Sequence, residues 1–198
     1  EDGIRYVERS RGLGDVYKRQ LRQSALPLTS LRYFHPSFMS LKTTHPLWTT
    51  CGNNSFEISK AIIQAKLLSG RYRTDSLLCS FGKNATTQCV LCKSENLGSI
   101  EHLLVVCDKL KFCRDKQFES LEKRSNVSDL LKKLIYDAYN TSVSKFVQIL
   151  LDCSVMAEVI QAKKLDANII CEIFKFTRTW CFNIHVNRMK LLGRWTSS

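Results

Sequence analysis

Four residues near the middle of the chain have the spacing of a metal-binding site. They form a C-x2-C-x9-H-x4-C pattern made of Cys89, Cys92, His102 and Cys107. Three thiolates and one imidazole are a complete tetrahedral set for Zn²⁺, with no position left open for water or substrate. The pattern therefore predicts a structural zinc ion. Binding of that ion would contribute on the order of 10–16 kcal/mol to the folding of a loop with little apolar core.

A plainer explanation is that these cysteines are buried as small hydrophobic residues, as free cysteines often are. Cys92 and Cys107 would then belong to the core. Cys113, six residues beyond Cys107, could also take the fourth ligand position, although its surroundings are typical of a helix interior. The other cysteines are expected to be core or incidental residues: Cys51, Cys79, Cys153, Cys171 and Cys181.

Composition narrows the cellular setting and the class of partner. The chain has nine cysteines in 198 residues, and its N-terminus lacks the apolar stretch of a secretory signal. We therefore expect reduced thiols in a cytoplasmic and/or nuclear protein, where cysteine clusters usually bind metal. No apolar run approaches the roughly 18–20 residues of a membrane span, so no membrane partner is expected. The net charge of +12 favours RNA or DNA as partners.

The first 20 residues do not resemble native protein. Residues 10–20 resemble the translation of a tagmentation adapter from sequencing libraries, and residues 1–5 match the upstream part of the same oligonucleotide. We expect residues 1–20 to be a disordered artefact that carries no fold information, and the true upstream sequence to be missing. Without this segment 25 basic and 14 acidic residues remain, so the chain keeps its basic character.

The remaining sequence predicts a mainly α fold, with a small CCHC knuckle inserted between helices and a helical C-terminal bundle after it. Residues 21–54 are expected to be a linker or arm, because they are rich in Pro, Thr, Ser and aromatic residues. Residues 55–107 would hold a helix and the zinc-binding module, and residues 108–198 the helical region. The expected helices of that region span roughly 109–124, 127–139, 142–152, 155–164 and 166–192.

Capping residues mark the start of two helices in the zinc-binding module. Asn54 and Glu57 form a capping-box-like pair, and Gly70 supplies the stop signal of the same helix. Its expected buried face comprises Ile58, Ala61, Ile62, Ala65 and Leu68. Ser99 can cap a second helix, which carries His102.

The last helix should begin at Asp166 and pack into the core. Its expected buried face comprises Ile169, Ile173, Phe176, Trp180 and Ile184. The basic residues in and after this helix predict either a basic stripe or the outer face of a bundle helix: Lys175, Arg178, Arg188, Lys190 and Arg194.

Nothing in the sequence predicts an active site in this fragment. A zinc deaminase would need His-x-Glu and Pro-Cys-x-x-Cys, and both motifs are absent. There is no Gly-rich phosphate loop, and nothing marks one cysteine as an activated nucleophile. The carboxylates nearest the cluster, Glu95, Glu101 and Asp108, are expected to be solvated or to hold the second nitrogen of His102.

Three segments around the cluster carry a family resemblance: residues 63–74, the Cys-Val-Leu-Cys of residues 89–92 and the Ile-Glu-His-Leu-Leu-Val-Val-Cys of residues 100–107. They resemble the zinc-binding region C-terminal to the reverse transcriptase of non-LTR (LINE-type) retrotransposons. The flanks, residues 30–34, 45–48, 177–182 and 191–195, are similar to proteins of this kind from marine invertebrates. The resemblance spans most of residues 26–195, and the central motif is its most specific part.

The resemblance implies that Cys89, Cys92, His102 and Cys107 match the family's zinc ligands one for one. The polymerase motif Tyr-x-Asp-Asp is absent, as is the Pro-Asp of a restriction-like endonuclease. We therefore expect a non-catalytic C-terminal fragment whose parent polyprotein is an RNA-directed DNA polymerase. The spacing differs from that of retroviral knuckles, because nine residues rather than four separate Cys92 from His102.

Three interpretations of the fragment remain open. It could contact template RNA or target DNA during target-primed reverse transcription, through basic and aromatic side chains near the cluster. The candidates are Arg71, Tyr72, Arg73, Lys83 and Lys93. The alternative is a zinc-stapled structural or protein-interaction domain that docks on the upstream reverse transcriptase domain, with these charges merely solvated. A third interpretation is a decayed element copy that encodes no working protein.

Overall fold

A computed structural model of the chain describes residues 32–34, 44–82, 88–95, 98–123, 129–156 and 168–194. Within these ranges the protein is mainly α-helical and contains no β-strand, which confirms the expected fold class. The expectations for residues 1–20, for most of residues 21–43, for most of the helix at 155–164 and for Asp166 fall outside the described residues.

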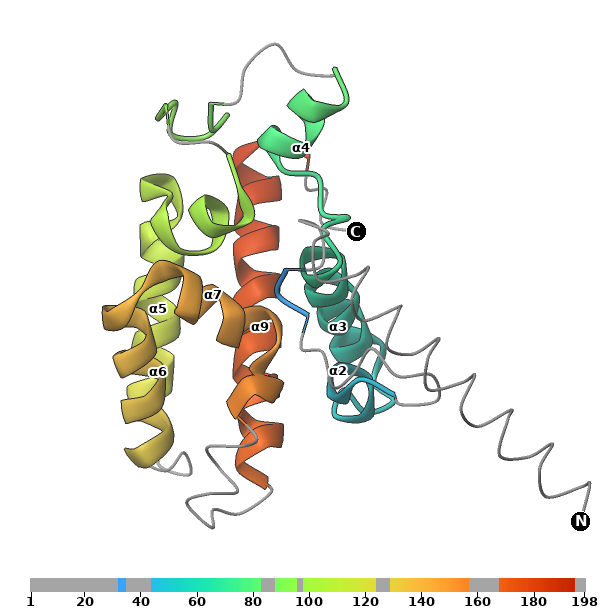
Figure 1. Cartoon of the computed structure of the whole chain (residues 1–198), viewed down its shortest axis with the longest axis vertical. Helices are drawn as coiled ribbons and strands as arrows, with labels where there is room; N and C mark the ends of the chain where they lie inside the picture. Colours follow the sequence, from blue (N-terminus) through green and yellow to red (C-terminus); the bar gives the residue numbers. More distant parts are fainter. Residues whose placement is uncertain are drawn as a thin grey trace, which may run out of the picture.

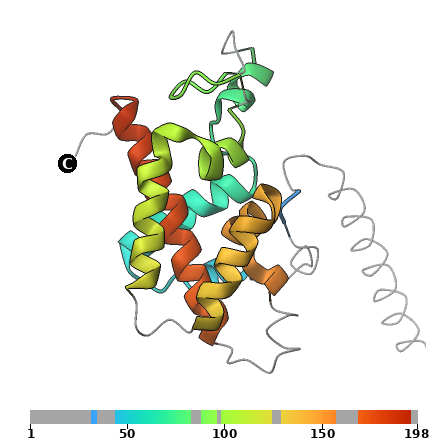
Figure 2. The ribbon, with the colours of Figure 1, turned by 90° about the vertical axis from the view of Figure 1, so that its left-hand side faces the viewer.

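The α-helices, in chain order, are α2 Pro46–Thr49, α3 Ser55–Leu68, α4 Asp75–Ser80, α5 Lys111–Glu122, α6 Asp129–Thr141, α7 Val143–Leu151 and α9 Asn168–Leu191. The long helix α9 is the centre of the bundle, and α3, α5 and α7 pack against it (Figure 1). Helix α6 packs against α7, and the turned view shows the same arrangement (Figure 2). None of the described helices combines the length and the apolarity that a membrane crossing requires.

Three short helical segments complete the described chain. They are the π-helix η3 His102–Val106 and two 3-10 helices, η4 Asp108–Leu110 and η5 Cys153–Val155. Helix α4 and the chain that follows it lie at the end of the bundle where α9 terminates (Figure 1). The predicted cysteine–histidine cluster is therefore carried at one end of the bundle, between α4 and α5.

The core between α5, α7 and α9 is aromatic. The fully buried Trp180 meets Phe118 and Phe146 edge-on, with ring centroids 5.2 Å apart in both pairs. Its indole nitrogen donates a hydrogen bond to the Leu104 carbonyl at 3.3 Å, which satisfies the only polar atom of the side chain. The expected core face of the last helix is confirmed, because Ile173, Phe176, Trp180 and Ile184 are buried and Ile169 is partly buried.

Helix α3 begins and ends as predicted. The Asn54 side chain accepts a hydrogen bond from the Phe56 backbone nitrogen at 2.8 Å. Gly70 follows the C-terminal turn with a φ of +66°, a conformation that glycine adopts without steric cost. Glu57, the expected capping-box partner, instead contacts Lys60 at 2.7 Å.

The predicted buried face of α3 is partly wrong. Ala61 and Leu68 are buried, but Ile58 and Ile62 are exposed, and the polar Gln64 is fully buried. The Gln64 amide donates to the Leu150 carbonyl at 2.7 Å and lies 3.2 Å from the Thr177 hydroxyl. Helix α3 therefore packs a polar side chain against the end of α7, because that surface offers hydrogen-bond acceptors.

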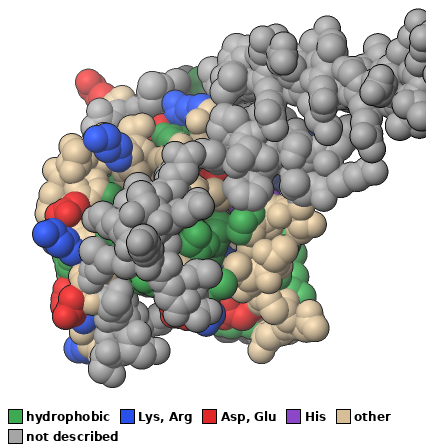
Figure 3. Space-filling model, turned by 60° about the horizontal axis from the view of Figure 1, so that its bottom comes forward, with side chains coloured by type: hydrophobic (Ala, Val, Ile, Leu, Met, Phe, Trp, Pro, Cys, Tyr) green, Lys and Arg blue, Asp and Glu red, His purple; other side chains and the backbone are tan. Residues whose placement is uncertain are grey.

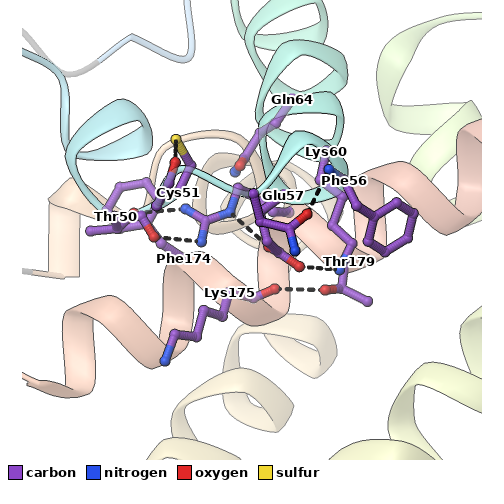
Figure 4. A network of polar contacts seen from close by, with 12 residues as sticks. Thr50, Cys51, Phe56, Glu57, Lys60, Gln64, Phe174, Lys175 and Thr179 are labelled. Atoms are coloured by element: carbon purple, nitrogen blue, oxygen red, sulfur yellow. Dashed lines mark hydrogen bonds and ion pairs between the residues drawn. The ribbon is translucent and has the colours of Figure 1, made fainter.

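The basic stripe considered for the last helix is not formed as a whole, because Arg178 and Arg188 are buried. Arg178 donates to the hydroxyl and the carbonyl of Thr50 at 2.7 and 2.8 Å, and lies 4.0 Å from Glu57 (Figure 4). A buried guanidinium needs such partners, since its desolvation is costly. Arg178 thereby holds the segment after α2 against α9.

Candidate metal centre

The structure brings the four predicted ligands together. The sulfur atoms of Cys89, Cys92 and Cys107 and the nearer ring nitrogen of His102 all lie within 4.8 Å of one another. Cys89 Sγ is 3.9 Å from Cys107 Sγ, and Cys92 Sγ is 3.3 Å from His102 Nε2. In tetrahedral zinc sites with bonds of about 2.0–2.3 Å, neighbouring donor atoms are about 3.5–3.8 Å apart. The four side chains are therefore close enough together to hold one metal ion.

A tight turn presents the first two thiols. The Lys93 backbone nitrogen donates to the Cys89 carbonyl at 2.8 Å, and the Cys89 nitrogen donates to the Ser94 carbonyl at 3.4 Å. Lys93 has a φ of 60° and is the one non-glycine residue in the described ranges with a positive φ. Left-handed backbone costs a lysine roughly 1–2 kcal/mol. The turn therefore has to be held by its neighbours, and a bound metal would do so.

A helical turn of unusual width presents the other two ligands. The Ser99 hydroxyl accepts a hydrogen bond from the His102 nitrogen at 3.2 Å, which confirms the predicted cap. The Cys107 nitrogen then donates to the His102 carbonyl at 2.8 Å, closing a five-residue π-type turn. π-turns are rare and often lie at functional sites. This turn explains how an x4 spacing can aim both side chains at one point.

The thiols of the cluster are not equivalent. Burial, and then the neighbouring Cys89, raise the pKa of Cys107 to about 12. Burial also acts to raise the pKa of Cys92, but hydrogen bonds with Ser94 and the other two thiols outweigh it and lower that pKa. Three crowded thiols cannot all ionise unless a cation compensates them. The donor set therefore suits a metal ion that deprotonates its thiol ligands.

The imidazole of the cluster is held in its neutral form. Burial, and secondarily the positive charge of Arg114, lower the pKa of His102. Its Nε2 atom faces Cys92, whereas Nδ1 is buried and has no hydrogen-bond partner in the described part of the chain. A neutral imidazole is the form that binds metals. The histidine is thus prepared to act as a ligand through Nε2.

The carboxylates expected near His102 do not hold it. Glu101 pairs with Arg32 and accepts a hydrogen bond from the Tyr33 hydroxyl. Glu95 and Asp108 are exposed, as the solvated alternative predicted. Of the two alternatives, the structure therefore supports solvation for Glu95 and Asp108, and none of the three carboxylates bonds the second imidazole nitrogen.

Asp75 is a neighbour of the cluster that the sequence did not reveal. Its Oδ2 atom accepts a hydrogen bond from the Val90 nitrogen, inside the Cys89–Cys92 turn, at 3.1 Å. Its Oδ1 atom lies 3.3 Å from the buried Arg188 guanidinium of α9. One carboxylate therefore ties the cysteine turn to the central helix.

The Asp75 side chain also explains why residue 98, which precedes the π-type turn of His102, is a glycine. A Cβ atom at Gly98 would lie 2.7 Å from the Asp75 Cβ, closer than real Cβ atoms approach. No signal for this contact exists in the linear sequence, because Thr74 and Asp75 look like an ordinary helix start. The Thr74 hydroxyl indeed caps α4, at 3.3 Å from the Leu77 nitrogen.

The candidate nucleic-acid contacts divide into three groups. Arg71, Arg73 and Lys93 are exposed, whereas Lys83 lies outside the described residues. Tyr72 is buried, with its hydroxyl 2.9 Å from His185 Nδ1. Its ring is thus packed inside the protein and is not available to stack on a base.

The other cysteines stay apart from the cluster. Cys113 is buried in α5 and accepts a hydrogen bond from the Asn187 amide at 3.4 Å. The group of four does not include it. Of the remaining cysteines, Cys51, Cys153 and Cys181 are buried, and Cys79 and Cys171 are partly buried.

Comparisons with known proteins identify no family. The chain matches no family model, no curated protein and no solved structure. The geometry alone describes a mainly helical protein with a Cys3His group that could hold a metal ion.

Proposed function

We propose that the chain is the non-catalytic, zinc-binding C-terminal module of a non-LTR retrotransposon reverse transcriptase. In this role it holds template RNA or target DNA beside the upstream polymerase domain. The observation that carries the proposal is the convergence of Cys89, Cys92, His102 and Cys107 on one point. The segments that supply these ligands are also the most specific part of the family resemblance.

Zinc in this module is a structural cross-link. Four protein ligands fill its coordination, so the ion would join the cysteine turn to the π-turn without activating a substrate. Zn²⁺ with three thiolates and a neutral imidazole carries one negative charge. The buried Arg114 lies close enough to lower the pKa of His102, and its positive charge offsets that excess.

Exposed cations near the cluster support contact with nucleic acid. Arg71, Arg73 and Lys93 are exposed, and none of the three has an ion pair within the described residues. Side chains of this kind can neutralise phosphates and release condensed counterions. The net charge of +12 also attracts nucleic acid, over longer distances than these three side chains do.

Salt dependence of binding tests this proposal. We expect the zinc-loaded chain to bind an RNA oligonucleotide, and about three phosphate contacts would weaken binding about 20- to 40-fold between about 50 and 200 mM salt. Fluorescence anisotropy measures this directly. Affinity that does not change with salt, or no binding at low salt, contradicts a nucleic-acid role.

Two observations favour the second candidate, a zinc-stapled protein-interaction domain. Ile58 and Ile62 lie one turn apart on α3 and are exposed. Figure 3 brings forward the end of the bundle opposite the cluster, where described acidic and basic side chains are mixed rather than segregated. This candidate predicts no RNA binding. It predicts instead binding to the purified polymerase domain that Ile62→Glu abolishes.

A further inference from the structure

A pocket lies at the end of the bundle that carries the cluster. Its volume is about 390 Å³. It is lined by Gly70, Arg71, Arg73, Leu77, Leu78 and Phe81. Phe81 is 67% exposed, more than the other exposed large hydrophobic residues of the described chain. An aromatic ring in contact with water at the wall of a pocket indicates a binding site for a flat, partly apolar group.

The charge of the pocket indicates what that group is attached to. Arg71 and Arg73 both line it, and none of the described acidic residues does. Neither guanidinium forms an ion pair or a side-chain hydrogen bond with another described residue. Guanidinium groups bind phosphate with paired hydrogen bonds. The pocket therefore offers an aromatic face and two guanidinium groups that no described carboxylate neutralises.

The two arginines are fixed by the residue between them. Arg71 and Arg73 are exposed and line the pocket, whereas Tyr72 between them is buried. The Tyr72 hydroxyl contacts His185, and Arg188 donates to the Arg73 carbonyl at 3.0 Å. Both anchors belong to α9. The backbone below the pocket is therefore held in place before any ligand binds.

We propose that this pocket binds one unstacked nucleotide of a single-stranded nucleic acid. The base stacks on Phe81, and Arg71 and Arg73 hold the adjoining phosphates. The volume lies in the range of small-molecule sites. A duplex hides its base faces, so stacking of this kind selects single strands. The inference rests on the proposed function and specifies which form of nucleic acid is bound.

A conservative substitution at Phe81 tests the stacking. Phe81→Leu keeps an apolar side chain and removes the aromatic face. With the zinc-loaded full chain and a labelled oligouridylate of about 12 nucleotides, we expect binding to weaken about 5- to 150-fold. Phe81→Tyr should bind like the native chain. Phe112→Leu is the matched control, because Phe112 is an exposed phenylalanine on α5 outside the pocket, and it should bind unchanged.

Substitution of the arginines tests the phosphate contacts. Arg71→Ala and Arg73→Ala should each lower the slope of log affinity against log salt by about 0.7, the value for one phosphate on a single strand. Lys116→Ala, an exposed cation on α5, should leave the slope unchanged. Zinc content equal to that of the native chain shows that each variant is folded around the cluster.

The outcomes separate this inference from the proposed function. A native chain that binds no nucleic acid overturns both. Native binding with a steep salt dependence that Phe81→Leu leaves unchanged overturns the pocket alone. The pocket assignment is also overturned if a duplex binds as tightly as the single strand. It is overturned as well if polyglutamate displaces the oligouridylate when both are present at the same concentration of negative charges. That last result would assign the pocket to an acidic peptide.

Discussion

Two regions of the molecule, the helical body and the cluster lobe, are stabilised in different ways. The helical body, formed by α5, α6, α7 and α9, is built around Trp180, Phe118 and Phe146, and its stability comes from apolar burial. The cluster lobe, the described residues from 70 to 107, has only short helical segments and carries the group of three thiols and one imidazole. One chain thus combines an apolar core with a lobe that carries a group able to hold a metal ion, and we expect each region to fail under a different perturbation.

Removal of the metal should have the largest effect and should be confined to the cluster lobe. Zinc binding contributes on the order of 10–16 kcal/mol to the folding of such sites. We expect a chelator, or Cys107→Ser, to abolish amide-exchange protection in the described residues 88–95 and 98–107 and to preserve it in α9. Cys79→Ser is the control, because Cys79 is outside the group of four. Equal loss of protection in the cluster lobe and in α9 would show that the two regions unfold as one cooperative unit.

Truncation of the core should have the converse effect. Trp180→Ala removes a fully buried indole between Phe118 and Phe146 and should lower the free energy of unfolding by about 3–5 kcal/mol. Zinc content per folded chain should stay the same. Urea unfolding gives the first quantity and metal analysis the second. Trp48→Ala, at an exposed tryptophan, should cost under about 0.5 kcal/mol, and a larger cost there would argue against burial as the cause.

Loss of the contact between the two regions should lower the free energy of unfolding by less than loss of the metal or of the aromatic core. Arg188→Met removes the partner of Asp75 and the donor to the Arg73 carbonyl, and should cost about 2–3 kcal/mol. A double-mutant cycle with Asp75→Asn should show a coupling of roughly 1 kcal/mol, because the two residues are in contact. Strict additivity would show that the carboxylate does not join the lobe to α9.

Low pH should weaken the contact between the cluster lobe and α9, because His185 of α9 bonds the Tyr72 hydroxyl there. Burial, then Arg188 and Lys66, lower the pKa of His185, so the folded protein resists its protonation. The unfolded chain binds the proton near its ordinary pKa of about 6.5. The free energy of unfolding should therefore fall as the pH drops below about 6.5. His185→Gln should flatten this part of the pH profile in urea titrations, and identical profiles for both proteins would contradict the assignment.

Local features of the fold could be predicted from the sequence. The cap at Asn54, the stop at Gly70 and the buried face of α9 depend on residues within a few turns of one another. The same holds for the four candidate metal ligands, because the two members of each pair, Cys89 with Cys92 and His102 with Cys107, are close in the chain. Short-range geometry is what residue spacing encodes.

Contacts between distant segments could not be predicted. Gln64 is buried because the Leu150 carbonyl accepts its hydrogen bond, 86 residues away in the chain. Arg188 is buried because Asp75 and the Arg73 carbonyl meet it on α9. A polar residue looks exposed in a sequence unless its partner is known, and only the folded chain supplies the partner.

Metal content tests the zinc assignment most directly. The native chain and the Cys79→Ser control, purified without added metal and analysed by mass spectrometry, should each contain one zinc ion per chain. Cys89→Ser and His102→Ala should contain none, because each removes one of the four ligands. One zinc ion per chain retained in both variants would contradict the assignment of these residues.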